Sequence, residues 1–238
     1  MAFGINSAAQ TAVQPRVEVR PLLRQVYMWM TLAMLTTAAS ALVITQVVTI
    51  ETLVQSPGLI IGAVVAQLAL VLGLSFGIRR FSATVATVVF FVYAATVGVT
   101  IALVLAFYNG STVVAAFGTT ALLFFVMTMM GMTTNMDLSK WRTYLFIGLI
   151  GLIIAMVVNV FLQSTGFEII ISLAGVVIFT ALTAYDTQKI KQMAADPAIQ
   201  AEGAALMGKL SILGALTLYL DFLNLFFFLL RLFALGDD

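Results

Sequence analysis

Hydrophobic and polar positions alternate along the chain in long blocks rather than with a short period. Each of seven apolar blocks, separated by short polar segments, reaches the roughly 20 residues that an α-helix needs to cross a hydrocarbon core about 30 Å thick. The predicted helices cover about residues 26–48, 58–78, 82–107, 112–132, 143–162, 167–185 and 210–233. The pattern therefore predicts an all-α polytopic membrane protein, a bundle of seven transmembrane helices.

Polar residues and prolines mark the ends of these blocks. All four prolines lie outside the predicted helices, as expected for residues that break helices. Only residues 187–208 are long enough to form a loop of their own, either as a short amphipathic helix or as an irregular segment. We therefore expect two regions: a polar cytoplasmic N-terminal segment, residues 1–24, and a seven-helix transmembrane domain, residues 25–238.

The composition excludes a soluble fold. Hydrophobic residues make up 62% of the 238 residues and charged residues 9%, whereas soluble domains have about 45–50% and about 25%. The first apolar block is too long for a signal peptide, so we expect it to be an uncleaved anchor. The net charge of +1 gives no indication of a nucleic-acid partner.

The positive charges predict the orientation in the cell (inner) membrane. Cytoplasmic loops carry an excess of Lys and Arg. With a cytoplasmic N-terminus and an extracytoplasmic C-terminus, Arg231 is the exception among 11 Lys and Arg residues. The other ten lie on the inner side: Arg16, Arg20, Arg24, Arg79, Arg80, Lys140, Arg142, Lys189, Lys191 and Lys209.

The chain contains no His and no Cys. It therefore lacks the commonest general base and the commonest metal ligand, which excludes ordinary metalloproteases and serine–histidine hydrolases. No protein-bound cofactor is expected, and we do not expect an enzyme.

Asp221 is the strongest candidate for a functional residue. It lies near the middle of the last predicted helix, where an ionisable side chain costs about 2.5–3.5 kcal/mol on insertion scales. Gly214, Thr217, Asp221 and Asn224 follow a spacing that places them on one face of a helix. This face is expected to point into the bundle.

Asp186 lies at the cytoplasmic end of the sixth predicted helix, with Thr183 on the same face. At 1.5 Å per residue, its distance from Glu168 places it near the membrane interface rather than at the depth of Asp221. Helix tilt, or a sixth helix that continues through Gln188, would bring the two aspartates together.

Two segments carry a family resemblance. Tyr185–Asp186–Thr187–Gln188 and the later Leu218–Tyr219–Leu220–Asp221–Phe222–Leu223–Asn224 resemble motifs of the transmembrane Bax inhibitor motif family, whose eponym is Bax inhibitor-1. Arg80–Phe81–Ser82–Ala83–Thr84 looks like the start of that family's third helix. The resemblance covers about residues 24–233, and the short loops look like those of a bacterial member.

The resemblance implies that six helices surround the last one. It also implies a pH-sensitive calcium leak in which Asp186 and Asp221 form the paired sensor. An arginine at the end of the family's second helix is thought to pair with them. Arg79 and Arg80 are the nearest equivalents, although a gap-free match places Gly77 at that position.

Two buried carboxylates within hydrogen-bonding distance cannot both ionise cheaply, so we expect the pair to share a proton that it loses as the pH rises. Repulsion then separates the helices. A doubly ionised pair is also a hard oxygen site that suits transient binding of Ca²⁺. Protons and Ca²⁺ are therefore expected to compete for Asp186 and Asp221.

Two other functions remain open. The first is a membrane protein that transports nothing and modulates a membrane protease complex or a stress response, with residues 1–24 and 189–209 as contact surfaces. The second is an intramembrane aspartyl protease, whose two aspartates would activate water. In such proteases Gly-x-Gly precedes the second aspartate, whereas Leu218–Tyr219–Leu220 precedes it here, and the Pro-Ala-Leu element is absent.

Overall fold

The computed structural model describes residues 20–78 and 80–236, and this part of the chain contains no β-strand. Its helices are α1 (Arg20–Val47), α2 (Ile50–Gln55), α3 (Pro57–Gly77), α4 (Ala83–Phe107), α5 (Gly110–Thr133), the 3₁₀-helix η1 (Leu138–Trp141), α6 (Arg142–Leu162), α7 (Thr165–Ala195), α8 (Pro197–Ala201) and α9 (Ala204–Ala234). Seven of the described helices are long and apolar enough to cross a membrane. The predicted seven-helix membrane fold is confirmed.

Serine residues between the apolar blocks begin two of the long helices. The Ser82 hydroxyl accepts a hydrogen bond of 3.2 Å from the backbone N–H of Val85 at the start of α4. The Ser164 hydroxyl accepts one of 3.3 Å from Phe167 at the start of α7. Each hydroxyl satisfies an N–H that has no partner within its helix.

The predicted boundaries of two helices and of the segment between them were wrong. α7 continues to Ala195 instead of ending near residue 185, and α9 begins at Ala204 instead of residue 210. The segment 187–208 is therefore mostly helical, and the short helix that was one of its two expected forms is α8. α1 begins at Arg20, so the boundary expected after residue 24 falls within a helix, and residues 1–19 lie outside the described part.

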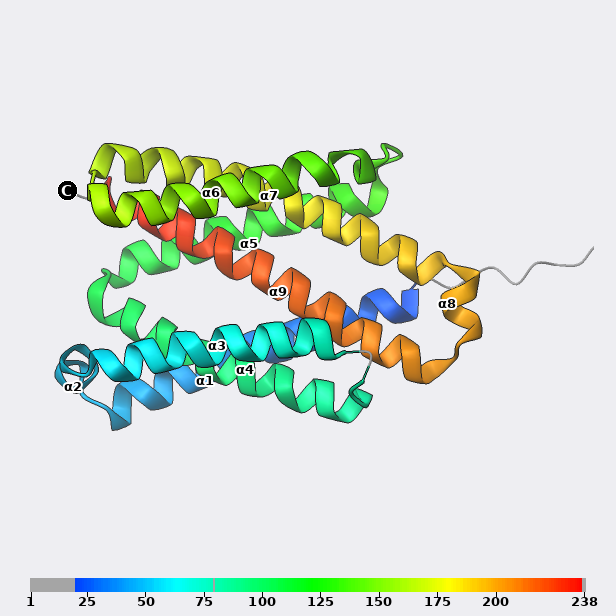
Figure 1. The fold of residues 1–238 in the computed structure, drawn as a ribbon, viewed down its shortest axis with the longest axis horizontal. Helices are drawn as coiled ribbons and strands as arrows, with labels where there is room; N and C mark the ends of the chain where they lie inside the picture. The colour runs from blue at the N-terminus through cyan, green and yellow to red at the C-terminus, as the bar shows by residue number, and fades with distance from the viewer. Residues whose placement is uncertain (1–19, 79, 237–238) are drawn as a thin grey trace, which may run out of the picture.

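The last helix, α9, lies at the centre of the bundle. It packs against α1, α4, α5 and α7, whereas α3 packs on α4 and α6 packs on α7. In the apolar 18-residue stretch of α9, 72% of the residues are buried, compared with 6% in the corresponding stretches of α3 and α6. In Figure 1, α9 crosses the bundle obliquely between α3 and α6, with α8 at one end of the bundle and α2 at the other.

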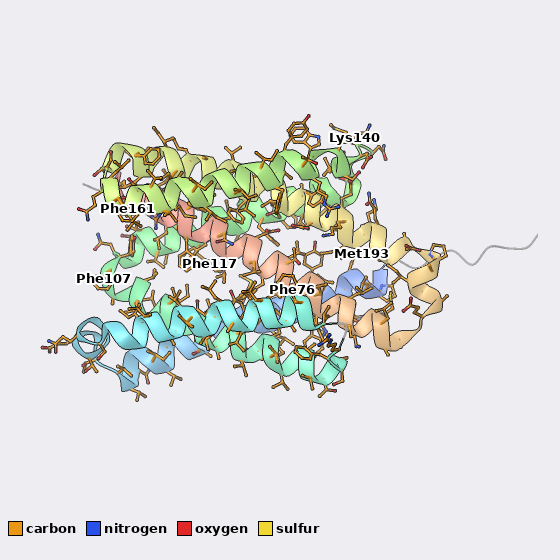
Figure 2. All side chains as sticks on the ribbon, viewed as in Figure 1. Phe76, Phe107, Phe117, Lys140, Phe161 and Met193 are labelled. Carbon is orange, nitrogen blue, oxygen red and sulfur yellow. The ribbon has the colours of Figure 1, made fainter. Side chains whose placement is uncertain are left out.

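The outer surface of the bundle is apolar. Phe76 and Phe161 are each 82% exposed, and Phe107 is 66% exposed. Figure 2 shows Phe107 and Phe161 toward the α2 end, and Lys140 and Met193 toward the α8 end. A surface of this kind is stable when lipid is the surrounding solvent.

Glycines allow the helices to approach closely where they cross. A Cβ atom at Gly131 in α5 would overlap the carbonyl oxygen of Ala184 in α7. A Cβ atom at Gly175 in α7 would lie 2.6 Å from the Phe228 ring in α9. Small residues have this role at helix contacts in membranes, where close packing replaces hydrophobic driving force.

We expect Gly131→Ala to destabilise the protein by about 1–3 kcal/mol, because the α5–α7 crossing has no space for a methyl group. Gly118→Ala is the matched control, since a Cβ atom at Gly118, also in α5, meets nothing within 4 Å. Thermal unfolding in detergent micelles measures both. Equal midpoints for the two variants would contradict this account of the crossing.

Candidate functional site

A cavity of about 610 Å³ lies beside the central helix and contains both predicted aspartates. Its walls come from α4, α6, α7 and α9. The polar lining residues are Thr100, Asp186, Thr217, Asp221, Asn224 and Arg231. The apolar lining residues are Leu149, Leu152, Ile153, Met156, Phe179, Leu182, Leu220, Phe227 and Phe228.

Asp186 and Asp221 are both buried, with relative exposures of 8% and 5%. Both side chains line the same cavity. No hydrogen bond joins the two carboxylates, although both belong to the described part of the chain. The Oδ2 atom of Asp221 has no hydrogen-bond partner, and Asp186 Oδ1 lies 4.0 Å from Lys189 Nζ. The two side chains thus form a neighbouring pair rather than a closed hydrogen-bonded dyad.

Asp186 lines the cavity from within α7, which is longer than predicted. Because α7 continues for more than two turns beyond Asp186, this residue lies inside a long helix rather than at its end. Of the expected alternatives, a sixth helix that continues through Gln188 is the one that the structure shows. The sequence signal for the longer helix is the spacing of Thr187, Ile190 and Ala194, which places them on one helix face. In the structure all three are buried.

Polar side chains attach this end of α7 to the last turn of α5 and to the segment between α5 and α6. The Gln188 side chain donates a hydrogen bond of 2.8 Å to the Met136 carbonyl and accepts one of 2.8 Å from the Leu138 N–H. Lys191 Nζ donates one of 2.6 Å to the Met132 carbonyl. These three bonds, which we call the α7 clamp, allow a polar helical turn to continue past Asp186.

A hydroxyl pair positions α9 close to Asp221. The hydroxyls of Tyr219 and Thr37 are 2.6 Å apart, and the Thr37 hydroxyl is also within hydrogen-bonding distance, 2.9 Å, of the Ala94 carbonyl. Tyr219 is fully buried. This contact connects α9 to α1 and α4 two residues before Asp221.

The predicted supporting residues have different positions. Thr217 and Asn224 line the cavity with Asp221. The Thr183 hydroxyl is buried and donates to the Phe179 carbonyl in its own helix, and Thr183 is not among the lining residues. Arg80 is exposed and is also absent from the lining, while Arg79 lies outside the described residues.

An ion pair at the α2 end of the cavity was not predicted from the sequence. Arg231 Nε in α9 lies 3.0 Å from Glu168 Oε1 in the first turn of α7, and Arg231 lines the cavity. The sequence places Glu168 beside a turn and makes Arg231 an exception to the charge distribution. The sequence signal for this ion pair is that two opposite charges lie at the same predicted end of the last two membrane-spanning helices.

The fold and this cavity define a polytopic α-helical membrane protein with a carboxylate pair beside a central helix. Residues 19–238 match the family described as inhibitor of apoptosis-promoting Bax1. The chain belongs to this family, the Bax inhibitor-1 family, and the predicted resemblance is confirmed.

Bacterial relatives match over most of their length. The chain is 41% identical over 227 residues to the inner membrane protein YbhL of Escherichia coli (strain K12), covering 95% of this chain and 96% of that protein. It is 38% identical over 210 residues to an uncharacterized protein of Borreliella burgdorferi, covering 88% and 89%. An uncharacterized membrane protein of Streptococcus pyogenes serotype M3 is 37% identical over 188 residues, covering 79% and 80%.

We expect Gln188→Ala to lower the free energy of unfolding by about 1–3 kcal/mol, because it leaves the buried N–H of Leu138 without a partner. Gln25→Ala is the control, since Gln25 is exposed on α1. Thermal unfolding in detergent compares the two. A Gln188 variant as stable as the Gln25 variant would show that the α7 clamp does not hold this end of the helix.

Proposed function

We propose that this protein is a pH-sensitive cation leak of the bacterial inner membrane, and that Asp186 and Asp221 form its proton sensor and ion-binding pair. The observation that carries the proposal is that two buried carboxylates from different helices line one cavity inside an apolar bundle. Intramembrane acidic residues facing a cavity are typical of ion pathways and proton relays. The inner-membrane location is supported by the relative in Escherichia coli.

The pair suits an ion that binds transiently. Calcium takes six to eight oxygen ligands at a stable site. Within the described residues no group of three acidic, His or Cys side chains is arranged to hold a metal. Two carboxylates, with the Asn224 side chain nearby, attract Ca²⁺ without forming a permanent site. We therefore propose Ca²⁺ as the transported ion and protons as its competitors.

The direction of the pH dependence follows from charge repulsion. At low pH the pair holds a proton, and the neighbouring side chains do not repel each other. When this proton is lost as the pH rises, two negative charges lie close together in a medium of low dielectric constant. Repulsion between α7 and α9 and attraction of a cation both increase, so the leak increases with pH.

We expect Asp221→Asn to reduce Ca²⁺ flux in liposomes containing a calcium dye by about tenfold, the effect of roughly 1.4 kcal/mol of lost ion stabilisation. The rise of flux with pH should disappear, because the remaining carboxylate no longer has a second carboxylate to repel. Asp186→Asn should have the same effect, so the test does not depend on one variant.

Glu202→Gln is the control for the flux experiment, since Glu202 is exposed beside α8 and lies outside the cavity. Thermal unfolding of each variant shows that it is folded. If folded Asp186→Asn and Asp221→Asn proteins both keep the flux and its pH dependence, the proposed sensor is wrong.

We also propose that the N-terminus and the α8 end face the cytoplasm. The chain has no cysteine, so single cysteines can report the orientation directly. Lys140→Cys, between α5 and α6, should react with a membrane-impermeant maleimide only in permeabilised cells. Asn109→Cys, between α4 and α5, should react in intact cells, because both positions are exposed and lie at opposite ends. The reverse pattern would invert the proposed orientation.

A further inference from the structure

The central helix is left open along one face. Between Ser211 and Arg231, fifteen side chains of α9 are buried and the others are half-buried. The half-buried residues, which we call the open seam, are Leu213, Thr217, Leu220, Asn224, Phe227 and Arg231. Their alternating spacing of four and three residues places them on one face of the helix.

The open seam lines the cavity whose other walls come from α4, α6 and α7. α3 and α6 pack on α4 and α7, respectively, rather than closely on α9, and in Figure 1 α9 crosses between them with no helix in front of it. All residues of the open seam except Leu213 line the 610 Å³ cavity. The cavity is therefore a groove along α9 on a side of the bundle that faces the bilayer.

The walls of the groove suit an acyl chain. The lining from α6 is apolar throughout, with Ile153 and Met156 among its residues, and α9 adds Leu220 and Phe227. Two polar side chains of the open seam donate hydrogen bonds within α9: the Thr217 hydroxyl to the Leu213 carbonyl, and one N–H of the Asn224 amide to the Leu220 carbonyl. An apolar chain beside them does not break these two bonds.

The α2 end of the groove suits a zwitterionic headgroup. The Arg231 guanidinium and the Glu168 carboxylate lie 3.0 Å apart, and their side chains remain 40% and 33% exposed. A phosphate next to a primary ammonium is complementary to this pair, because Arg binds phosphate with two parallel hydrogen bonds and a carboxylate accepts from an ammonium. A quaternary ammonium has no N–H to donate.

We propose that the groove along α9 binds one phospholipid whose headgroup carries a phosphate and a primary ammonium. The phosphate binds Arg231, the ammonium binds Glu168, and one acyl chain lies along the open seam. Lipid binding can be measured without any ion flux, so this proposal and the proposed leak can fail separately.

The first test fills the groove. Ile153 and Ile154 are adjacent in α6 and are 49% and 58% exposed, but only Ile153 lines the cavity. Full-length protein is placed in phosphatidylcholine vesicles that also contain a phosphatidylethanolamine with a diazirine in one acyl chain. The vesicles are then illuminated, and the labelled peptides are identified. Ile153→Trp should reduce labelling of α9 peptides by about threefold or more, as expected when a bulky side chain occupies the space. Ile154→Trp should leave the labelling unchanged.

The second test addresses the headgroup. Native mass spectrometry of the purified protein should show one retained phosphatidylethanolamine in preference to phosphatidylcholine. Arg231→Gln should reduce this retention by about tenfold, the effect of losing one charge-assisted hydrogen bond. Labelling that is equal in the Ile153 and Ile154 variants, or retention of phosphatidylcholine equal to that of phosphatidylethanolamine, would overturn the proposal.

A photoreactive residue at Leu220 identifies the occupant directly. Leu220 lies on the open seam and lines the cavity. Capture of a phospholipid, seen as an added lipid mass on the chain, supports the proposal. Capture of another protein helix or of a second copy would overturn it and would make the groove a protein-binding surface.

Discussion

The bundle depends on enclosing a carboxylate that cannot face lipid. Asp221 lies in the interior of a long apolar helix, where an exposed charge would cost several kcal/mol. The helix that carries it is therefore at the centre, in contact with α1, α4, α5 and α7. Glycines at the crossings, such as Gly131 and Gly175, make this close approach sterically feasible.

The packing around Asp221 is close, but it does not provide hydrogen bonds for the whole carboxylate. The Tyr219–Thr37 contact holds α9 against α1 and α4 close to Asp221, yet one oxygen of Asp221 remains buried without a partner. A buried acceptor without a hydrogen-bond donor lowers stability, and such groups are uncommon in folded proteins. Its position beside Asp186 in a cavity is the physical basis for assigning ion and proton chemistry to this pair.

The two aspartates differ in how their helices are held. α9 is fixed by packing on four helices, whereas the end of α7 beyond Asp186 is held by the polar bonds of the α7 clamp. Hydrogen bonds at a helix end are exchanged with water more readily than a packed core is opened, so this end of α7 is held less firmly than α9.

The sequence by itself determined the number of membrane-spanning helices, the class of the fold and the polar face around Asp221. These features follow from block length and helical spacing, which are local properties of the chain. The tertiary structure decided what depends on contacts between distant residues: the continuation of α7 past Asp186, the Arg231–Glu168 pair and the open seam of α9. Hydropathy ended α7 too early because it scores Gln188 and Lys191 as exposed polar residues. A hydropathy pattern does not contain the hydrogen bonds that these side chains form in the folded protein with the Met132 and Met136 carbonyls and the Leu138 N–H.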